Sequence, residues 1–382
     1  MRRTRRLWAA LLLSCLLLAG CWDRRELEEH STVLASGVDL CAEGDSEGCR
    51  LVVTRQIAIP GRIPLGGGEG MGGVRDTVTV IRSPGKDGPD SARRTQAALH
   101  RKISFGHIRI LVFSEEFAHH GMTDFVQYVR RIPEARRLLW VAVSEGPAEQ
   151  VIRSQPSLER VPALFLSDMF EDAVKTGRLP NIYWGDFLAR ISNKGEETIA
   201  PLIRMPAPDH PALTGLAVFL GHRMVGKLNL EETATYMEMR GLKRGGELLA
   251  VPLPNGGKAS LTVYGRKARW RLGLANGRIR ARVRIDLEAD LNELSVGLRS
   301  SDPAVAGLIE REAARLVSRR ATALTARLQK EFKSDILGLG ELVRAHLPQA
   351  WAGIRDWNSD FARAQLSFDV QVSVRRTGMT MD

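Results

Sequence analysis

Cysteine residues carry the most specific chemistry in this sequence. Cys21 stands directly after Leu18-Ala19-Gly20, at the end of a short apolar run that begins behind four arginines. A basic start, an apolar run and small residues before a cleavage point are the three parts of an export leader. The apolar run is shorter than the roughly 20 residues that span a bilayer. A cysteine in this place completes a lipobox, which predicts that residues 1–20 are removed and that a diacylglyceryl group is attached to Cys21.

The lipid is expected to hold the mature chain on a membrane. Each buried methylene contributes about 0.8 kcal/mol, so one acyl chain binds marginally and two bind stably. The alternative is an ordinary cleaved leader followed by a chance cysteine. We favour the lipoprotein, because the basic region, the apolar run and the cleavage residues all fall in register.

Two further cysteines point to a disulfide. Cys15 leaves with the leader and Cys21 is acylated, so Cys41 and Cys49 remain in a chain expected to be exported, where disulfides persist. The residues between them form a polar turn, and a bridge across it would stabilise the fold by about 2.5 kcal/mol. Two free thiols are the alternative, and we favour the bridge.

Residues for catalysis or metal binding are not found in a recognisable pattern. None of the eight histidines is spaced as His-Glu-x-x-His, and no Gly-x-Ser-x-Gly or Cys-x-x-Cys occurs. His119 and His120 would point about 100° apart on a helix, which suits one metal ion poorly. Acid pairs such as Glu115-Glu116 are typical of helix starts. The sequence therefore predicts no enzyme, no metal and no cofactor other than the lipid on Cys21.

Composition describes an ectodomain and limits the classes of partner. The 382 residues are 44% hydrophobic and 26% charged, and no second apolar run is long enough to span a bilayer. The formal net charge is +11, and a positive surplus remains when the four leader arginines are removed. This surplus is compatible with an anionic membrane surface or an acidic partner, although simple solubility is the plainer explanation. Nucleic acid is not expected, because the chain carries no motif for it.

Strand and helix patterns alternate in the first 200 residues. Residues 33–40 and 50–59 are predicted to form a hairpin across the Cys41–Cys49 turn. The glycine-rich residues 60–73 are predicted to be a loop, since glycine supplies no side chain to pack. Further strands are predicted at 76–82, 108–113 and 138–143, and helices at 91–102, 124–131, 147–153 and after the cap residue Ser114. The alternation favours a sheet with helices packed on it.

The middle of the chain contains an aromatic group and a run of prolines. Tyr183, Trp184 and Phe187 are a candidate partner contact, but core packing is the favoured explanation. Four prolines between Pro201 and Pro211 predict an extended linker and a domain boundary. A hairpin at 215–228 and a helix at 231–239 are predicted to follow.

Alternation is strongest in the last third of the chain. Residues 281–291 alternate between apolar and charged types, which indicates a strand with one buried and one solvated face. Antiparallel strands are predicted at 258–264, 268–274, 278–294 and 366–375, and helices at 302–332 and 340–346. The predicted fold is therefore an α+β, multi-domain ectodomain of mixed or antiparallel β-sheets, each packed with α-helices. Its predicted parts are a leader at 1–20, an α/β domain at 21–200, a linker and middle domain at 201–257, and an α+β domain at 258–382.

Several stretches in the expected order resemble the Ger(x)C family of spore germination lipoproteins, the C subunits of nutrient germinant receptors. The start Cys21-Trp22-Asp23-x-x-Glu26 is similar to the family's mature N-terminus. Other similar stretches are 105–109 with 112–118, 215–219 with 224–226 and 228–233, 335–340, Pro348, Trp351, Trp357, Phe361, and 374–378. Two features depart from the usual pattern, namely the Cys41/Cys49 pair and the long glycine-rich loop.

The resemblance implies a three-domain α+β ectodomain on the outer face of the spore inner membrane. It implies two partners beside the membrane, a membrane-embedded A subunit and a transporter-like B subunit. It further implies a non-enzymatic receptor subunit that is needed for nutrient-triggered germination. A lipid-anchored extracytoplasmic solute-binding protein is the alternative, but such a protein should have two similar α/β lobes, and the two halves of this chain look unlike. A cell-wall hydrolase is disfavoured because no acid pair or metal set supports it.

Overall fold

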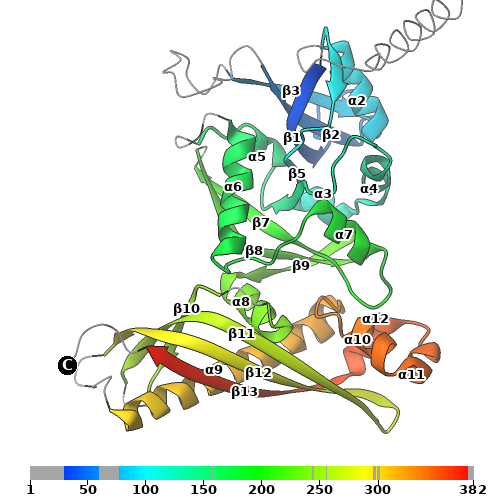
Figure 1. The fold of residues 1–382 in the computed structure, drawn as a ribbon. Helices are drawn as coiled ribbons and strands as arrows, with labels where there is room; N and C mark the ends of the chain where they lie inside the picture. The colour runs from blue at the N-terminus through cyan, green and yellow to red at the C-terminus, as the bar shows by residue number, and fades with distance from the viewer. Residues whose placement is uncertain are drawn as a thin grey trace, which may run out of the picture.

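The fold consists of two lobes, each built on one β-sheet with helices packed against it (Figure 1). The computed structural model describes residues 30–59, 77–156, 159, 161–207, 209–242, 245–254, 256–295, 298 and 302–376. The first lobe holds a nine-stranded sheet and the second a four-stranded sheet. The α+β class and the mixed sheets that the sequence predicts are therefore confirmed.

The sheet of the first lobe is mixed. Its strand order is β3-β2-β1-β5-β6-β7-β8-β9, and β4 pairs with β1. The central pairs β1/β5, β5/β6 and β6/β7 are parallel, whereas the hairpins at both edges are antiparallel. The strands are β1 (His30–Leu40), β2 (Leu51–Ala58), β3 (Val78–Gly85), β4 (Lys102–Ser104), β5 (Ile110–Ser114), β6 (Trp140–Ser144), β7 (Ile199–Ala207), β8 (His210–Leu220) and β9 (Arg223–Asn229).

Side chains that accept hydrogen bonds from the first N–H groups cap the start of several helices in the first lobe. The Ser114 hydroxyl accepts a hydrogen bond from the Phe117 N–H (3.2 Å) and caps α3 as predicted. The Asp39 carboxylate accepts the first N–H groups of α5, from Ala148 and Glu149. The helices are α2 (Gly88–Ala97), α3 (Glu115–His120), α4 (Thr123–Arg130), α5 (Ala148–Ile152), α6 (Pro162–Lys175), α7 (Trp184–Ile191) and α8 (Leu230–Arg240), of which α6 was not predicted.

The prediction of an extended linker at Pro201–Pro211 is wrong. Residues 201–207 lie in β7 and residues 210–211 at the start of β8, inside the first sheet. Pro206 is tolerated because β6 pairs with β7 only at Leu202 and Ile203, and because the β7/β8 register shifts between Arg204 and Ala207. A proline at such an irregular, edge-like place removes no ladder hydrogen bond. The strands found between residues 201 and 257 accordingly belong to two different sheets. β7–β9 lie in the first sheet and β10 lies in the second.

The second lobe is a four-stranded sheet covered on one face by a long helix. The strands β10 (Glu247–Pro252), β11 (Lys258–Ala275), β12 (Arg278–Leu294) and β13 (Gln365–Arg376) follow in that order across the sheet. Between β12 and β13 lie α9 (Pro303–Arg327), the π-helical turn η4 (Leu328–Phe332), α10 (Leu339–His346), α11 (Pro348–Ala352) and α12 (Trp357–Arg363). Asp302 caps α9 through its carboxylate and the Ala304 N–H (2.8 Å).

Two predictions for this lobe need correction. The strands predicted at 258–264 and 268–274 are one strand, β11, which is irregular between Val263 and Gly265 but continuous. The last strand is parallel to β12, not antiparallel. The crossover through α9–α12 returns the chain to the same end of the sheet, and parallel pairing requires such a crossover.

The aromatic group at Tyr183 packs in the core. Trp184 and Phe187 are buried, and the Tyr183 ring packs, tilted by 43°, against that of buried Trp140 with their centroids 4.3 Å apart. The favoured explanation of core packing is confirmed, and these residues do not form an exposed contact surface.

Gly226→Ala should weaken the contact of β9 with η4. A Cβ atom at Gly226 would lie 2.1 Å from the buried Phe332 ring, so the ring must shift. We expect a loss of about 1–3 kcal/mol in the free energy of unfolding, as overpacked cores show. Denaturant unfolding measures it. The control is Gly273→Ala, where a Cβ meets no atom within 4 Å and stability should rise by up to about 1 kcal/mol. Equal effects of the two changes would contradict this packing.

Candidate functional site: a joint between the lobes and a cleft in the first lobe

A short segment after η4 joins the second lobe to the first sheet. Ser334 and Asp335 in this segment are fully buried. The Ser334 hydroxyl donates to the Phe219 carbonyl on β8 (2.6 Å), and the Glu197 N–H donates to the Asp335 carbonyl (2.9 Å). Lys333 (φ 51°) and Gly338 (φ 71°) adopt left-handed conformations at either side. We call residues 333–340, with the side chains that contact them, the joint.

The Asp335 carboxylate is the centre of the joint. Its Oδ2 atom accepts hydrogen bonds from the Gly340 N–H and the Trp357 indole N–H, both at 2.9 Å. Its Oδ1 atom has no donor among the described residues. Complete burial raises the pKa of this carboxyl to about 6, against the opposing effects of its hydrogen-bond donors and of the nearby Arg240 charge. A buried acid of this kind is costly unless the surrounding donors are held in place.

A second acid beside the joint carries two ion pairs. Glu196 precedes β7 and lies 3.3 Å from an Arg190 nitrogen on α7 and 3.0 Å from Arg240 on α8. Arg240 also donates to the Leu337 carbonyl within the joint. This arginine therefore connects an acid of the first lobe to the backbone of the second.

Two glycines, Gly195 and Gly340, allow a close approach of the lobes. A Cβ at Gly340 would lie 2.6 Å from the Trp357 indole and 2.7 Å from the Gly195 Cα atom. The Glu341 N–H donates to the Gly195 carbonyl (3.1 Å) across the same contact. Trp351 packs on Trp357 with ring centroids 5.5 Å apart. The joint is thus tightly packed, and its charged groups are engaged in structural contacts.

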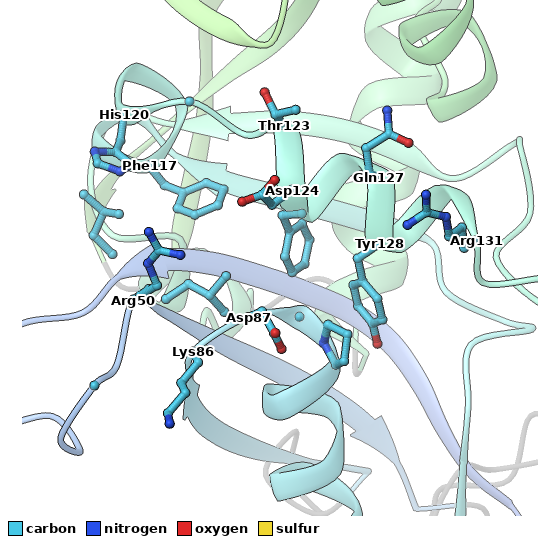
Figure 2. Close-up of a pocket in the computed structure, with 17 residues that line it drawn as sticks. Arg50, Lys86, Asp87, Phe117, His120, Thr123, Asp124, Gln127, Tyr128 and Arg131 are labelled. Carbon is cyan, nitrogen blue, oxygen red and sulfur yellow. The ribbon is translucent and has the colours of Figure 1, made fainter.

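A cleft of about 860 Å³ lies in the first lobe, between the starts of β2 and α2 and the helices α3 and α4 (Figure 2). Buried Phe117 and Phe125 form part of its wall. Charged side chains at its rim are Arg50, Lys86, Asp87, Asp124 and Arg131. A cleft of this size can take a small ligand, but its rim charges are solvent-exposed and include no nucleophile paired with a base.

The loop that carries Cys41 and Cys49 borders this cleft through Gly48 and Arg50. The two cysteines are joined by a disulfide, with Cα atoms 6.0 Å apart. Within the loop, Asp45 accepts hydrogen bonds from Arg82 Nη1 (2.7 Å) and Nη2 (3.1 Å). These bonds lower the pKa of the Asp45 carboxyl. The rim of the cleft is therefore fixed by one covalent bond and one bidentate ion pair.

Other residues singled out in the sequence do not gather into a site. The expected lipid-attachment residue Cys21 and the glycine-rich loop 60–73 lie outside the described residues. Among the described residues, Cys41, Asp45 and Cys49 are the one group of three metal-ligand types close together, and the disulfide uses both sulfur atoms. His119 contacts the Met224 carbonyl (2.9 Å), whereas His120 faces the cleft. In the same ranges, no helix combines the length and the apolar composition that crossing a membrane requires.

The sequence did not single out the joint as one site, although its parts were visible. The stretches at 215–219 and 335–340 and the residue Trp357 belonged to separate motifs. The structure brings them together, since Phe219 binds Ser334 and Trp357 binds Asp335. The stretch 105–109 lies elsewhere, where the Phe105 N–H donates to Glu134 (3.1 Å). The signal that could have pointed to the joint is a short acidic and glycine-containing segment between two helices.

Asp335→Asn should remove a pH dependence of stability. The pKa of Asp335 is raised from 3.8 to about 6, so the folded chain holds this proton more tightly than the unfolded chain. The resulting stability is complete below about pH 4 and is lost as the pH rises through about 6. The variant has no such proton to lose. Relative to the wild type, its free energy of unfolding should rise by up to about 3 kcal/mol between about pH 4 and pH 7.

Urea unfolding followed by tryptophan fluorescence at both pH values measures this difference. Asp90→Asn is the control, because hydrogen bonding from Arg93 lowers the pKa of Asp90 to about 2 and its titration is complete below that pH range. That variant should show no rise. A constant difference between Asp335→Asn and the wild type would contradict the proposed cost of the buried charge.

Two family models together match nearly all of the expected mature chain, in order. The first, described as a spore germination protein N-terminal domain, matches residues 23–205. The second, described as spore germination B3/GerAC like, C-terminal, matches residues 214–378. The boundary between the two models falls close to the start of β8, within the first sheet.

Similar proteins cover almost the whole length. Spore germination protein GerQC of Bacillus cereus is 21% identical over 376 residues, which are 98% of this chain and 99% of the relative. Spore germination protein KC of Bacillus subtilis is 24% identical and covers 97% and 95%. Spore germination protein A3 of the same species is 25% identical and covers 96% of each chain.

A solved structure has the same fold. The crystal structure of the GerBC protein superposes with a TM-score of 0.60 at 15% sequence identity, and it covers 92% of this chain and 99% of that one. Together with the two family models, this likeness leads to one conclusion: the chain belongs to the Ger(x)C family of spore germination proteins.

Proposed function

We propose that this chain is a lipid-anchored, non-catalytic subunit of a germinant receptor, required when nutrients trigger spore germination. The observation that carries the proposal is the ordered match of both family models from residue 23 to residue 378. The relatives over the same length are named as spore germination proteins. We further propose that its partners are a membrane-embedded A subunit and a transporter-like B subunit.

The anchor in this proposal is a diacylglyceryl group on Cys21, which holds the chain on the outer face of the spore inner membrane. The lipobox Leu18-Ala19-Gly20-Cys21 supports it. The match to the first family model begins at residue 23, just after this cysteine. A lipid anchor also agrees with an ectodomain whose described helices are too short or too polar to cross a bilayer.

A subunit without catalysis fits the chemistry of the described residues. The buried acid Asp335 faces two donors and no nucleophile, and Glu196 is engaged with two arginines. The alternative of a solute-binding protein is less favoured. Such a protein would close two similar lobes over a ligand, whereas these lobes hold sheets of different size and strand order.

Deletion of the gene in its host tests the proposed function. Loss of spore refractility would be followed after addition of nutrients and, separately, after a non-nutrient trigger that bypasses receptors. We expect loss of the nutrient response alone, restored by a plasmid copy. Failure with both triggers would place the chain in a later step of germination. Normal nutrient germination in a strain lacking all paralogues would contradict the proposal.

Cys21→Ala in the plasmid copy should abolish membrane attachment and the nutrient response together. The thiol is the attachment atom of the proposed lipid, and alanine offers none. Fatty-acid labelling and immunoblots of spore membrane fractions measure attachment. Cys15→Ala is the matched control, because that cysteine lies in the leader and should be removed with it. A Cys21→Ala chain that still takes up labelled fatty acid would contradict the assigned site.

A further inference from the structure

The hairpin of β11 and β12 carries arginines on one face. Arg269 pairs with Arg284 across the two strands, Arg271 with Arg282, and Gly273 with Arg280. Residues directly opposite in an antiparallel pair project to the same side, and so does every second residue along each strand. One face of the hairpin therefore presents Arg269, Arg271, Arg278, Arg280, Arg282 and Arg284. We call this set the arginine face.

Much of this positive charge is not neutralised within the described chain. Arg269 and Arg284 share the single carboxylate of Asp286, and Arg280 donates to the Gln365 side chain (2.8 Å). Arg271 and Arg282 form no ion pair with another described residue. They also stand directly opposite one another, an arrangement that is destabilising for like charges. The fold thus retains a repulsive pair that simple solubility does not require.

The large side chains of the arginine face are all polar. The neighbouring strand β13 adds Gln365, Ser367, Asp369 and Gln371 to the same side, opposite Arg280, Arg282, Arg284 and Asp286 of β12. At its centre, a Cβ atom on Gly273 would meet no other atom within 4 Å. The apolar residues of the hairpin lie on the reverse face, where the Trp270 indole donates to the Met239 carbonyl of α8 (3.2 Å).

These properties discriminate between two kinds of anionic partner. A specific protein partner requires a desolvated centre with aromatic or aliphatic anchors surrounded by a polar rim. The arginine face supplies no such anchor. A bilayer with anionic headgroups requires only a broad surface of Lys and Arg close to its charge. A broad cationic sheet face meets that second requirement.

We propose that the arginine face is a membrane-binding surface, which lies against the anionic phosphate headgroups of a lipid bilayer. This contact is separate from the anchor proposed at Cys21 and does not depend on it. Its effect is to fix the orientation of the second lobe over the bilayer. The hairpin extends to the far end of that lobe (Figure 1), so it can reach a surface without help from the first lobe.

The test places a fluorescent reporter on the face itself. Gly273→Cys puts a thiol between Arg271 and Arg280 in open space, and an environment-sensitive dye is attached to it. The complete mature lipoprotein is reconstituted with vesicles of phosphatidylcholine alone or mixed with phosphatidylglycerol. We expect a blue shift of the dye emission with the mixed vesicles only, and its loss at high salt. The same dye at Leu138→Cys, an exposed position in the first lobe, controls for non-specific adsorption.

Removal of individual charges then identifies which arginines contact the bilayer. Arg271→Gln with Arg282→Gln should abolish the blue shift, because each Lys or Arg near an anionic surface contributes about fivefold to the partition coefficient. The control is Arg93→Gln with Arg363→Gln, which removes the same charge from exposed helix positions and should leave the shift unchanged. Far-ultraviolet circular dichroism verifies that each variant is folded.

Three outcomes would overturn the proposal. The dye could remain in water with both vesicle types, which would leave the arginine face as a solvated surface only. It could respond equally to neutral vesicles. It could also respond to inorganic phosphate or polyglutamate at the same ionic strength, which would make the partner a free anion or an acidic protein. Flotation with neutral vesicles reports the Cys21 anchor separately, so failure of the anchor is distinguished from failure of the arginine face.

Discussion

The burial of one carboxylate governs how the lobes of this chain fit together. Asp335 has no contact with solvent, and a charge in that place is tolerated only where donors are held against it. The Gly340 N–H and the Trp357 indole supply them, so the segment must fold back on itself and α12 must pack over it. The same segment hydrogen bonds to Phe219 and Glu197 of the first lobe. The same segment therefore supplies the hydrogen bonds that the buried carboxylate requires and the contacts that dock the lobes.

Local signals in the sequence predicted local structure well. The hairpin around Cys41 and Cys49, the Ser114 cap and the start of α9 at Asp302 depend on residues within a few positions of each other. The alternation in β12 predicted its buried and solvated faces for the same reason. The charges on the solvated face were interpreted only as a soluble surface, because the sequence did not show that Arg271 and Arg282 would stand opposite one another.

Predictions failed where distant residues decide the structure. In the sequence, the prolines that begin at Pro201 indicate a linker. In the structure, β8 pairs with β7 across a register shift, so both segments are strands. Gly265 and the buried Arg266 interrupt the alternation of β11 without ending the strand. The joint and the cleft were likewise hidden, since Asp335 lies far from Phe219 in the chain, and the cleft draws its rim from β2, α2 and α4.

The parallel pairing of β12 with β13 has a consequence for how the chain acquires its structure. A chain that is synthesised from its N-terminus emerges in order, and the nine strands of the first sheet are complete by Asn229. The second sheet is different, because β13 ends at Arg376 and pairs along most of β12 across α9–α12. Until β13 has emerged, one edge of β12 has no partner and the inner side of α9 lacks part of its cover. The second sheet can therefore be completed only long after every strand of the first has emerged, and the joint closes between a first sheet that can form early and a second that forms late.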